Sequence, residues 1–372
     1  MKNSKELHIV SFNIPYPANY GGVIDVFHKL VALNELGVKI HLHCFKYGRK
    51  ESKILEKYCQ KVYYYNRKMT WKNLFSPVPF ITKSRESETL IHRLSKTPFP
   101  ILLEGLHCTE ILHRRELKNH KVFVRTHNVE TDYYKLLAKN ESNFFKKIYL
   151  YIEYLKVERY EKRISNSEGV FTISRADQEH FKRISKSYLI KAFHSNPSIQ
   201  SKVGSGDYAL YHGNLTVSEN ENAALFLINE VFSKLNYNFI IAGKKASYKL
   251  RKACQSYSHI QLINSPKDEE MDKLIIDAHM ILLPTQQNTG IKLKLIESLY
   301  KGRFCIANDK MITGTDLESY CLQAKNSLDW IKQIKKTKDL EFTKEYTEQR
   351  QSLCTLFNNK IEAQKMIDVI FA

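Results

Sequence analysis

Several features that define other classes of protein are scarce in this sequence of 372 residues. Glycine (13 residues) and proline (9 residues) fall below their usual share, which excludes a collagen-like or linker-rich chain. A largely disordered chain is excluded too, because aromatic residues make up 12% of the sequence. At roughly 150 residues per domain, the length predicts about two domains.

Long apolar runs and paired cysteines are also missing. No stretch reaches the ~18 apolar residues of a membrane-spanning helix, and the apolar run after the charged N-terminus is too short for a signal peptide. The cysteines are odd in number, never form a CxxC pair and fit neither a disulfide framework nor a zinc site: Cys44, Cys59, Cys108, Cys254, Cys305, Cys321 and Cys354. We expect a soluble, cytoplasmic protein with reduced cysteines.

Acidic residues are few relative to basic ones. The 58 Lys and Arg outnumber the 39 Asp and Glu, which gives a formal net charge of +19. Nucleic acid, an anionic membrane surface and phosphorylated small molecules are all partners that such a charge attracts. Composition alone leaves these three open.

Short β-rich runs alternate with helical patterns, which predicts parallel α/β architecture. The first helix is expected over Val23–Leu36, and Gly37 ends it. Seven runs predict a doubly wound sheet of six or seven strands: Leu7–Phe12, Val38–Phe45, Lys61–Tyr65, Pro100–Glu104, Lys121–Thr126, Gly169–Ile173 and Tyr188–Ala192.

A second alternation follows dense turn residues at Ser195–Asp207, which read as a linker. Strands are expected at Tyr208–His212, Phe239–Ala242, Ile260–Ile263, Met280–Leu283 and Phe304–Ala307, with helices at Asn222–Phe232, Asp268–Asp277 and Ile291–Lys301. Two Rossmann-like domains result, at 1–200 and 207–352. A last helix near Phe357–Phe371, within 353–372, is surplus to the second sheet.

Two glycine-containing loops precede helices. Gly21 and Gly22 lie between the first strand and the first helix, where backbone amides can face a phosphate, although a simple tight turn explains them equally well. The segment Thr289–Glu297 also runs from a loop into a helix, and its Lys292 and Lys294 add positive charge. An ordinary amphipathic helix with solvated lysines is the alternative.

Polar side chains cluster in Arg125–Glu130, at the carboxyl end of a predicted strand, where ligands bind in open α/β sheets. The neighbouring strand ends at Glu104–His107 and faces the same edge. The helix over Phe144–Ile164 combines an apolar stripe with basic residues and suits an anionic membrane, but also an ordinary domain helix with a solvated basic face.

Several catalytic motifs are absent: DxD, GxSxG, Walker A, HExxH, the EF-hand and GxGxxG. No metal or other cofactor is therefore expected. His41 and His43 share a strand face without a third ligand, and we interpret them as packing residues.

In order and spacing, the motifs resemble those of GT-B fold glycosyltransferases of the family-4 type, particularly bacterial surface-polysaccharide enzymes. The glycine loop with its first helix (Pro15–Gly37), the series Arg125–Glu130, Tyr160–Lys162 and Thr172–Asp177, the segments Tyr211–Leu215 and Asn220–Ala224, and the helix region Gly290–Gly302 carry the resemblance. It implies two Rossmann-like domains facing a central cleft, with the C-terminal helix crossing back to the first domain.

The resemblance further implies a retaining, metal-independent transfer of a sugar from a nucleotide-diphosphate donor to a glycan or lipid-linked acceptor. The donor would lie mainly on the second domain and the acceptor on the first. Donor contacts would come from Gly21, Gly22, Gly213, Gly243, Thr289, Gly290, Ile291, Lys292, Lys294 and Glu297, with Glu297 on the ribose. His127, with Arg125 and Glu130 around it, would lie near the transferred sugar.

Two departures from the family pattern matter. Thr289 stands where the family has the first glutamate of a pair, and the usual basic pair after the Gly-x-Leu turn is missing, so Lys292 or Lys294 would supply the phosphate charge. The leading interpretation is a cytoplasmic enzyme of polysaccharide biosynthesis that associates peripherally with the inner face of the cytoplasmic membrane and has no nucleic-acid partner. A catalytically degenerate partner subunit, a basic nucleic-acid-binding protein and a non-hydrolysing sugar-nucleotide epimerase are the alternatives.

Overall fold

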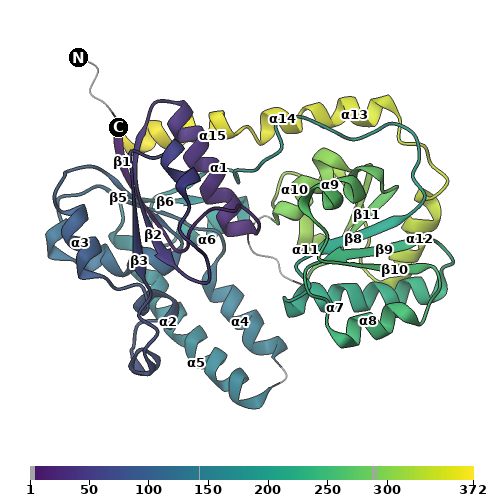
Figure 1. Ribbon diagram of the computed structural model, residues 1–372, viewed down its shortest axis with the longest axis horizontal. Coiled ribbons are helices and arrows are strands. Elements are labelled where there is room, and N and C mark those ends of the chain that lie inside the picture. The colour runs from purple at the N-terminus through teal and green to yellow at the C-terminus, as the bar shows by residue number, and fades with distance from the viewer. Residues whose placement is uncertain (1–4, 142, 287–289, 291) are drawn as a thin grey trace. The chain divides into compact units, whose positions relative to one another are not determined.

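The computed structural model describes residues 5–141, 143–286, 290 and 292–372, and the chain divides into two compact units. The first unit comprises Met1–Ser195, Thr289–Ile291 and Phe357–Ala372. The second comprises Asn196–Asn288 and Lys292–Leu356. Each unit contains one parallel sheet (Figure 1).

The first unit is built on a seven-stranded sheet in the order β3-β2-β1-β4-β5-β6-β7, with every recorded pairing parallel. The strand order reverses between β1 and β4, which is the place where doubly wound sheets bind ligands. The strands are β1 (Glu6–Ser11), β2 (Lys39–Lys46), β3 (Lys61–Asn66), β4 (Ile101–Glu104), β5 (Val122–Arg125), β6 (Gly169–Thr172) and β7 (Ser187–Leu189).

Helices cover both faces of this sheet. They are α1 (Gly21–Glu35), α2 (Phe80–Lys83), α3 (Glu88–Leu94), α4 (Glu130–Asn140), α5 (Phe144–Glu161), α6 (Arg175–Phe181) and α15 (Asn359–Ile370), with short 3₁₀ turns η1 (Lys53–Lys57), η2 (Trp71–Phe75), η3 (Leu106–His113), η4 (Arg115–Leu117) and η5 (Lys162–Asn166). Alternate residues of β1 face opposite sides: Ile9 packs with α1 and α15, and Val10 packs with α3 and α5.

The C-terminal helix α15 belongs to the first unit and lies beside α1 (Figure 1). It begins at Asn358, whose side chain accepts hydrogen bonds from the backbone N–H groups of Lys360 and Ile361. Its Glu362 accepts a hydrogen bond from the backbone N–H of Lys191 at 2.7 Å. The last helix therefore closes a face of the first sheet and holds the segment that follows β7 in place.

The second unit has a six-stranded sheet in the order β10-β9-β8-β11-β12-β13. Its strands are β8 (Ala209–Gly213), β9 (Phe239–Gly243), β10 (Ile260–Asn264), β11 (Met280–Leu283), β12 (Phe304–Ala307) and β13 (Leu322–Gln323). Its helical segments are α7 (Ser218–Phe226), η6 (Leu227–Val231), η7 (Phe232–Lys234), α8 (Tyr248–Gln255), α9 (Asp268–Asp277), α10 (Leu293–Lys301), α11 (Asp309–Ile312), η8 (Glu318–Tyr320), α12 (Ser327–Thr337), α13 (Lys344–Gln351) and α14 (Leu353–Leu356).

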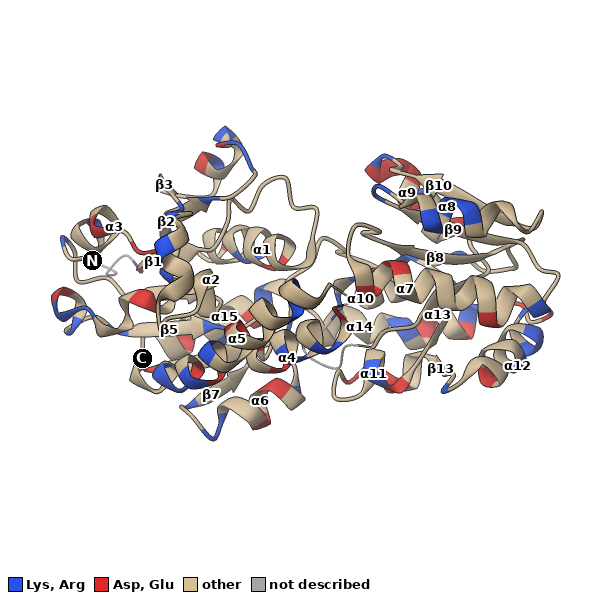
Figure 2. Ribbon diagram, turned by 90° about the horizontal axis from the view of Figure 1, so that it is seen from below, with Lys and Arg blue, Asp and Glu red and all other residues tan. Residues whose placement is uncertain are grey.

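The predicted fold class is confirmed, since both units are parallel α/β layers. Some local predictions differ: β13, only two residues long, was not predicted, and the helix expected over Asn222–Phe232 starts at Ser218 and turns into a π-helical segment at Leu227. Lysine and arginine residues occur along the ribbon of both units (Figure 2). Among the described residues, no helix combines the length and apolar character needed to cross a membrane.

Candidate functional site

Three residues that the sequence analysis singled out meet at the carboxyl edge of the first sheet. Arg125 is the last residue of β5, His127 follows it, and Glu104 is the last residue of the adjacent strand β4. From α1, Asp25 and Lys29 face the same edge. Together Asp25, Lys29, Glu104, Arg125 and His127 form a group that we call the buried ion network.

The network pairs the two carboxylates of Asp25 and Glu104 with the basic side chains of Lys29 and Arg125. Arg125 donates to Asp25 at 2.9 Å, and Lys29 Nζ lies 3.0 Å from Asp25 and 2.7 Å from Glu104. The side chains of Lys29, Glu104 and Arg125 are completely buried. Burial alone would raise the pKa of Asp25, but Arg125 and Lys29 outweigh it and hold that pKa well below its usual range.

His127 is the member of the network that reaches the surface, with 13% of its side chain exposed. Its Nε2 lies 3.1 Å from Glu104, and its ring meets the ring of Phe12 edge-on at 5.6 Å. Glu104 and Phe12 fix the orientation of the imidazole, while Lys29 and His127 lower the pKa of Glu104 against the opposing effect of burial. The ring is therefore presented at the sheet edge in one orientation.

All recorded hydrogen bonds of Arg125 go to other groups of the first unit. Besides Asp25, it donates to the carbonyl oxygens of Thr172, Ile190 and Lys191, at 3.2, 2.5 and 3.1 Å. These contacts hold the end of β6 and the segment that follows β7 against the end of β5. The geometry thus gives Arg125 a positioning role and leaves His127 as the member that a ligand can touch.

Asp25, Glu104 and His127 have the spacing of a metal site among the described residues, with ligand atoms within 4.8 Å of one another. The charges do not fit a metal, however. Lys29 already bridges both carboxylates, and Arg125 holds Asp25, so a divalent cation would have to displace an ammonium group from between them. The carboxylates of Asp25 and Glu104 therefore suit the ammonium group of Lys29 that lies between them.

Glu130, the third predicted catalytic residue, lies in the first turn of α4 and is 6% exposed. Burial and the nearby Glu161 raise the pKa of Glu130 to about 8. Glu161 itself accepts hydrogen bonds from Thr131 at 3.0 Å and His180 at 2.8 Å. Glu130 makes no recorded hydrogen bond or ion pair with the buried ion network within the described part of the chain.

Gly21 and Gly22 open helix α1, whose N-cap residue Tyr20 provides no side-chain cap. A Cβ atom added to Gly22 would lie 2.7 Å from Cζ of Phe12, whereas one on Gly21 would meet nothing within 4 Å. Any larger residue at Gly22 would therefore have to displace the ring of Phe12. Without a side-chain cap, the first-turn amides of α1 keep the geometry that a phosphate ligand needs.

In the second unit, Gly213 and Gly243 end the neighbouring strands β8 and β9. A Cβ atom on Gly243 would lie 1.9 Å from the carbonyl oxygen of Gly213. Only glycine therefore allows this backbone approach, which brings both strand ends to the carboxyl edge of the second sheet.

Lys294 is drawn into the second unit. Its Nζ donates to Asn220 at 3.2 Å and lies 5.1 Å from the ring centre of Tyr211, and burial lowers its pKa to about 8. Of the two lysines predicted to supply phosphate charge, Lys294 is therefore committed to packing. Lys292, the N-cap residue of α10, is the better candidate for that role.

Glu297 lies on α10 with 33% of its side chain exposed and pairs with Lys301 at 3.0 Å. Lys301 also pairs with Asp272 of α9 at 2.5 Å. Thr289 and Ile291 lie outside the described residues. Gly290 has a φ of +65°, which favours glycine, and it groups with the first unit.

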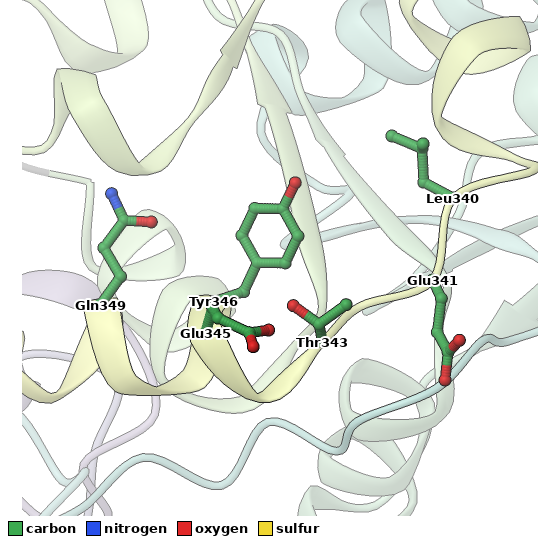
Figure 3. A pocket seen from close by; sticks show the side chains of 6 residues that line it. All are labelled: Leu340, Glu341, Thr343, Glu345, Tyr346 and Gln349. Atoms are coloured by element: carbon green, nitrogen blue, oxygen red, sulfur yellow. The ribbon is translucent and has the colours of Figure 1, made fainter.

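A hollow of about 390 Å³ lies elsewhere in the second unit (Figure 3). It is lined by Leu340, Glu341, Thr343, Glu345, Tyr346 and Gln349. Tyr346 contacts Phe304, the first residue of β12, so the hollow lies at the amino end of that strand. Since ligands bind at carboxyl ends of parallel strands, this hollow does not belong to the candidate site.

Sequence reasoning missed Asp25 and Lys29. They stand four residues apart on the apolar side of α1, among buried neighbours such as Val26 and Leu30. Two opposite charges at that spacing on an otherwise apolar helix face were the available signal.

Solved structures with the same fold span almost the whole chain. The crystal structure of TarM shows a TM-score of 0.72 at 10% identity and covers 100% of this chain and 99% of its own. A UDP-forming α,α-trehalose-phosphate synthase from Burkholderia vietnamiensis shows a TM-score of 0.65 at 9% identity over 98% and 99%. A glycosyltransferase from Rickettsia africae shows 0.63 at 13% identity over 99% and 98%. The protein has the GT-B fold.

One sequence relative also covers most of the chain. The chain is 27% identical over 363 residues to an uncharacterized 44.6 kDa protein in the cps region of Klebsiella pneumoniae, covering 90% of this chain and 93% of the relative. No protein-family model matches the sequence.

The first prediction from this site concerns Asp25→Asn. Removing the negative charge leaves Arg125 and Lys29 buried with too few counter-charges, so the free energy of unfolding should fall by roughly 3–5 kcal/mol. Urea unfolding measures it. Glu348→Gln, which removes the partner of exposed Lys344, is the control and should cost less than about 1 kcal/mol. Equal costs for the two variants would contradict a network held by buried charge.

The second prediction concerns pH. Folded Glu130 keeps its proton up to about pH 8, whereas the unfolded chain loses it near 4.5, so this group's stabilisation disappears as pH rises between those values. Relative to the wild type, Glu130→Gln should therefore gain stability with rising pH, with a slope of at most about 1.4 kcal/mol per pH unit. Urea unfolding of both proteins from pH 5 to 9 provides the comparison. A difference that stays constant over this range would show that Glu130 ionises normally.

Proposed function

We propose that this protein is a glycosyltransferase of the family-4 type that moves a sugar from a nucleotide-diphosphate donor to a glycan or lipid-linked acceptor. The GT-B fold over the whole chain carries the proposal, and the cps-region relative supports surface-polysaccharide biosynthesis as its setting. The reaction proposed is retaining and independent of metal, with no protein nucleophile.

The proposed division of roles follows the two sheet edges. The second unit binds the donor, with Lys292 near the diphosphate and Glu297 on the ribose. In the first unit, amides at Gly22 face the diphosphate and His127 faces the transferred sugar. Catalysis comes from holding the reactants in place and from stabilising the departing diphosphate with amides and positive charge.

Donor binding is the direct test. A nucleoside diphosphate present at 100 times its dissociation constant should stabilise the protein by about 2.7 kcal/mol, visible as a thermal shift. We expect one of UDP, GDP, ADP and dTDP to act selectively and to act equally with EDTA. A shift that EDTA abolishes would contradict metal independence. No shift with any nucleotide would contradict donor binding and favour a degenerate subunit or a nucleic-acid-binding protein.

A matched pair of variants locates the donor. Glu297 and Asp272 both pair with Lys301, but only Glu297 is proposed to hold the ribose. Glu297→Gln should weaken binding of the nucleotide about tenfold or more, because it removes a charged hydrogen-bond acceptor, and Asp272→Asn should leave binding nearly unchanged. Equal losses would show an effect through Lys301 alone.

We also propose that the protein binds anionic membranes through a surface of the first unit. The side chains of Trp71, Phe75, Phe144 and Phe145 are 68–80% exposed, and we call them the aromatic patch. Lys156, in the second half of α5, donates to the carbonyl oxygen of Leu74 at 2.6 Å, so η2 contacts the same helix whose first turn carries Phe144 and Phe145, about 16 Å further along its axis. Lys72, Lys146 and Lys147 flank the patch in the sequence. Exposed aromatic rings beside lysines match the interface of an anionic bilayer.

Vesicle co-sedimentation tests this surface. Binding to vesicles with anionic phosphatidylglycerol should fall about tenfold or more in Phe144→Ser/Phe145→Ser, and wild-type binding should weaken with salt. The control is Tyr248→Ser/Leu328→Ser, which removes two exposed apolar side chains of the second unit. Equal binding by both double variants would overturn the proposal. A change in oligomeric state with the first variant, without membrane binding by the wild type, would assign the patch to a second copy of the chain.

A further inference from the structure

Three arginines lie at the carboxyl edge of the first sheet, outside the buried ion network. Arg67 follows β3, Arg49 follows β2, and Arg85 donates to the carbonyl oxygen of Phe12, just after β1. Electrostatic coupling connects Tyr20 with both Arg49 and Arg85, and Arg85 with Arg67. We call Arg49, Arg67 and Arg85 the arginine cluster. It stands at the β1 side of the point where the strand order reverses.

Arg85 is the member that most needs explanation. It is 4% exposed, yet no described carboxylate lies within ion-pairing distance of it. Its Nε donates to Phe12 at 3.0 Å and its Nη1 to Ile81 at 2.5 Å, both to carbonyl oxygens. Burial lowers the pKa of Arg85 to about 10, so the guanidinium remains charged at neutral pH. A buried cation without a counter-charge is costly.

Two other buried arginines show what a structural role looks like in this chain. Arg125 is paired with Asp25, and Arg350 donates to three carbonyl oxygens and to the hydroxyl of Ser201. Arg85 has neither a carboxylate partner, as Arg125 has, nor the four acceptors that surround Arg350. Among the described residues its Nη2 finds no acceptor, which leaves one side of the fork available.

The other two arginines also lack carboxylates among the described residues. Arg67 donates to the hydroxyl of Ser84 and lies over the ring of Tyr47, 4.3 Å from its centre. Arg49 donates to Asn19 and to the carbonyl oxygen of Pro17, and lies 5.4 Å from the centre of the Tyr20 ring. The cluster thus gathers three positive charges with neutral partners.

The nearby acids do not neutralise the cluster. Glu130 is the carboxyl group coupled to Arg85, and its raised pKa of about 8 keeps it largely protonated at pH 7. Glu104 is held by Lys29 and His127, and Glu86 pairs with Lys83 at 2.9 Å. Burial lowers the pKa of His107, and Arg85 and Arg67 lie close enough for their charges to lower it further. Its buried Nδ1 has no hydrogen-bond partner among the described residues. The three cations of the arginine cluster therefore have no carboxylate partner among the described residues.

We propose that the arginine cluster binds an oxyanion, a phosphate or carboxylate group, and that this group belongs to the sugar acceptor. Arginine matches both groups because its planar fork donates two parallel hydrogen bonds to paired oxygens. The assignment to the acceptor rests on the proposed function, whereas the oxyanion site itself does not. A sugar phosphate, a uronic acid and a lipid-linked sugar phosphate share this chemistry.

Thermal shift and calorimetry with inorganic phosphate, pyrophosphate and glucuronate test the site, with neutral glucose as the blank. At least one oxyanion should stabilise the wild type, and salt should weaken that effect. Arg85→Gln should lower the affinity about tenfold or more, and Arg67→Gln should lower it in the same direction. Arg93→Gln is the control. Arg93 belongs to α3 and lies over the rings of Tyr63 and Tyr65 of β3, so this variant should bind oxyanions like the wild type.

The outcomes separate the sources of the group. A preference for phosphate or pyrophosphate assigns a phosphorylated acceptor, and a preference for glucuronate assigns an acidic sugar. No stabilisation by any oxyanion, or stabilisation that Arg67→Gln and Arg85→Gln leave unchanged, would overturn the proposal. If Arg85→Gln does not fold, Arg67→Gln decides, because Arg67 is only half-buried.

A donor-site variant keeps this test apart from that of the proposed function. Glu297→Gln should lose nucleotide binding and keep the response to inorganic oxyanions, whereas Arg67→Gln should show the reverse. A wild type that binds oxyanions at the arginine cluster but no nucleotide would retain the site and refute the glycosyltransferase.

Discussion

The first unit depends on the pairing of Asp25 with Arg125 inside the protein. Asp25 receives hydrogen bonds from Arg125, from Lys29 and from the backbone N–H of Phe193, and so joins α1, β5 and the chain beyond β7. Each of these groups would be costly to bury alone, and together they cancel. The end of the sheet where His127 stands is therefore fixed by electrostatics as much as by apolar packing.

This arrangement separates two uses of positive charge at one sheet edge. In the buried ion network, cations and carboxylates balance, so the network gives rigidity and a defined orientation for His127. In the arginine cluster no carboxylate of the described residues balances the charges, so Arg85 keeps unused hydrogen-bonding capacity. The same type of residue thus maintains structure in one place and leaves a demand for an anion in the other.

The layers of the fold could be predicted from the sequence because parallel strands buried on both faces are continuous apolar runs, as in Met280–Leu283. Strand β13 has two residues and offers no such pattern. The grouping of Arg125 with His127 could also be predicted, since both stand within one short segment at a strand end.

The roles of the remaining site residues could not be predicted, because those roles depend on distant partners. Asp25 and Lys29 stand out in the sequence only as two charges on an apolar helix face, and their role becomes visible when Glu104, from another strand, lies against Lys29. Arg85 stands in a polar segment, and only its contact with Phe12 shows that it is buried. The sequence predicts that Lys294 contacts the donor phosphate, with a solvated lysine as the alternative, whereas in the fold Lys294 packs against Tyr211 and donates to Asn220.

The position of α15 has a consequence for synthesis on the ribosome. The first unit needs Phe357–Ala372 to cover α1, but these residues are made after the whole second unit. At bacterial and eukaryotic elongation rates of about 5–20 residues per second, the intervening chain takes on the order of ten seconds or more. During that time the apolar face of α1 that α15 covers stays open to solvent, a period in which a chaperone has a defined surface to protect.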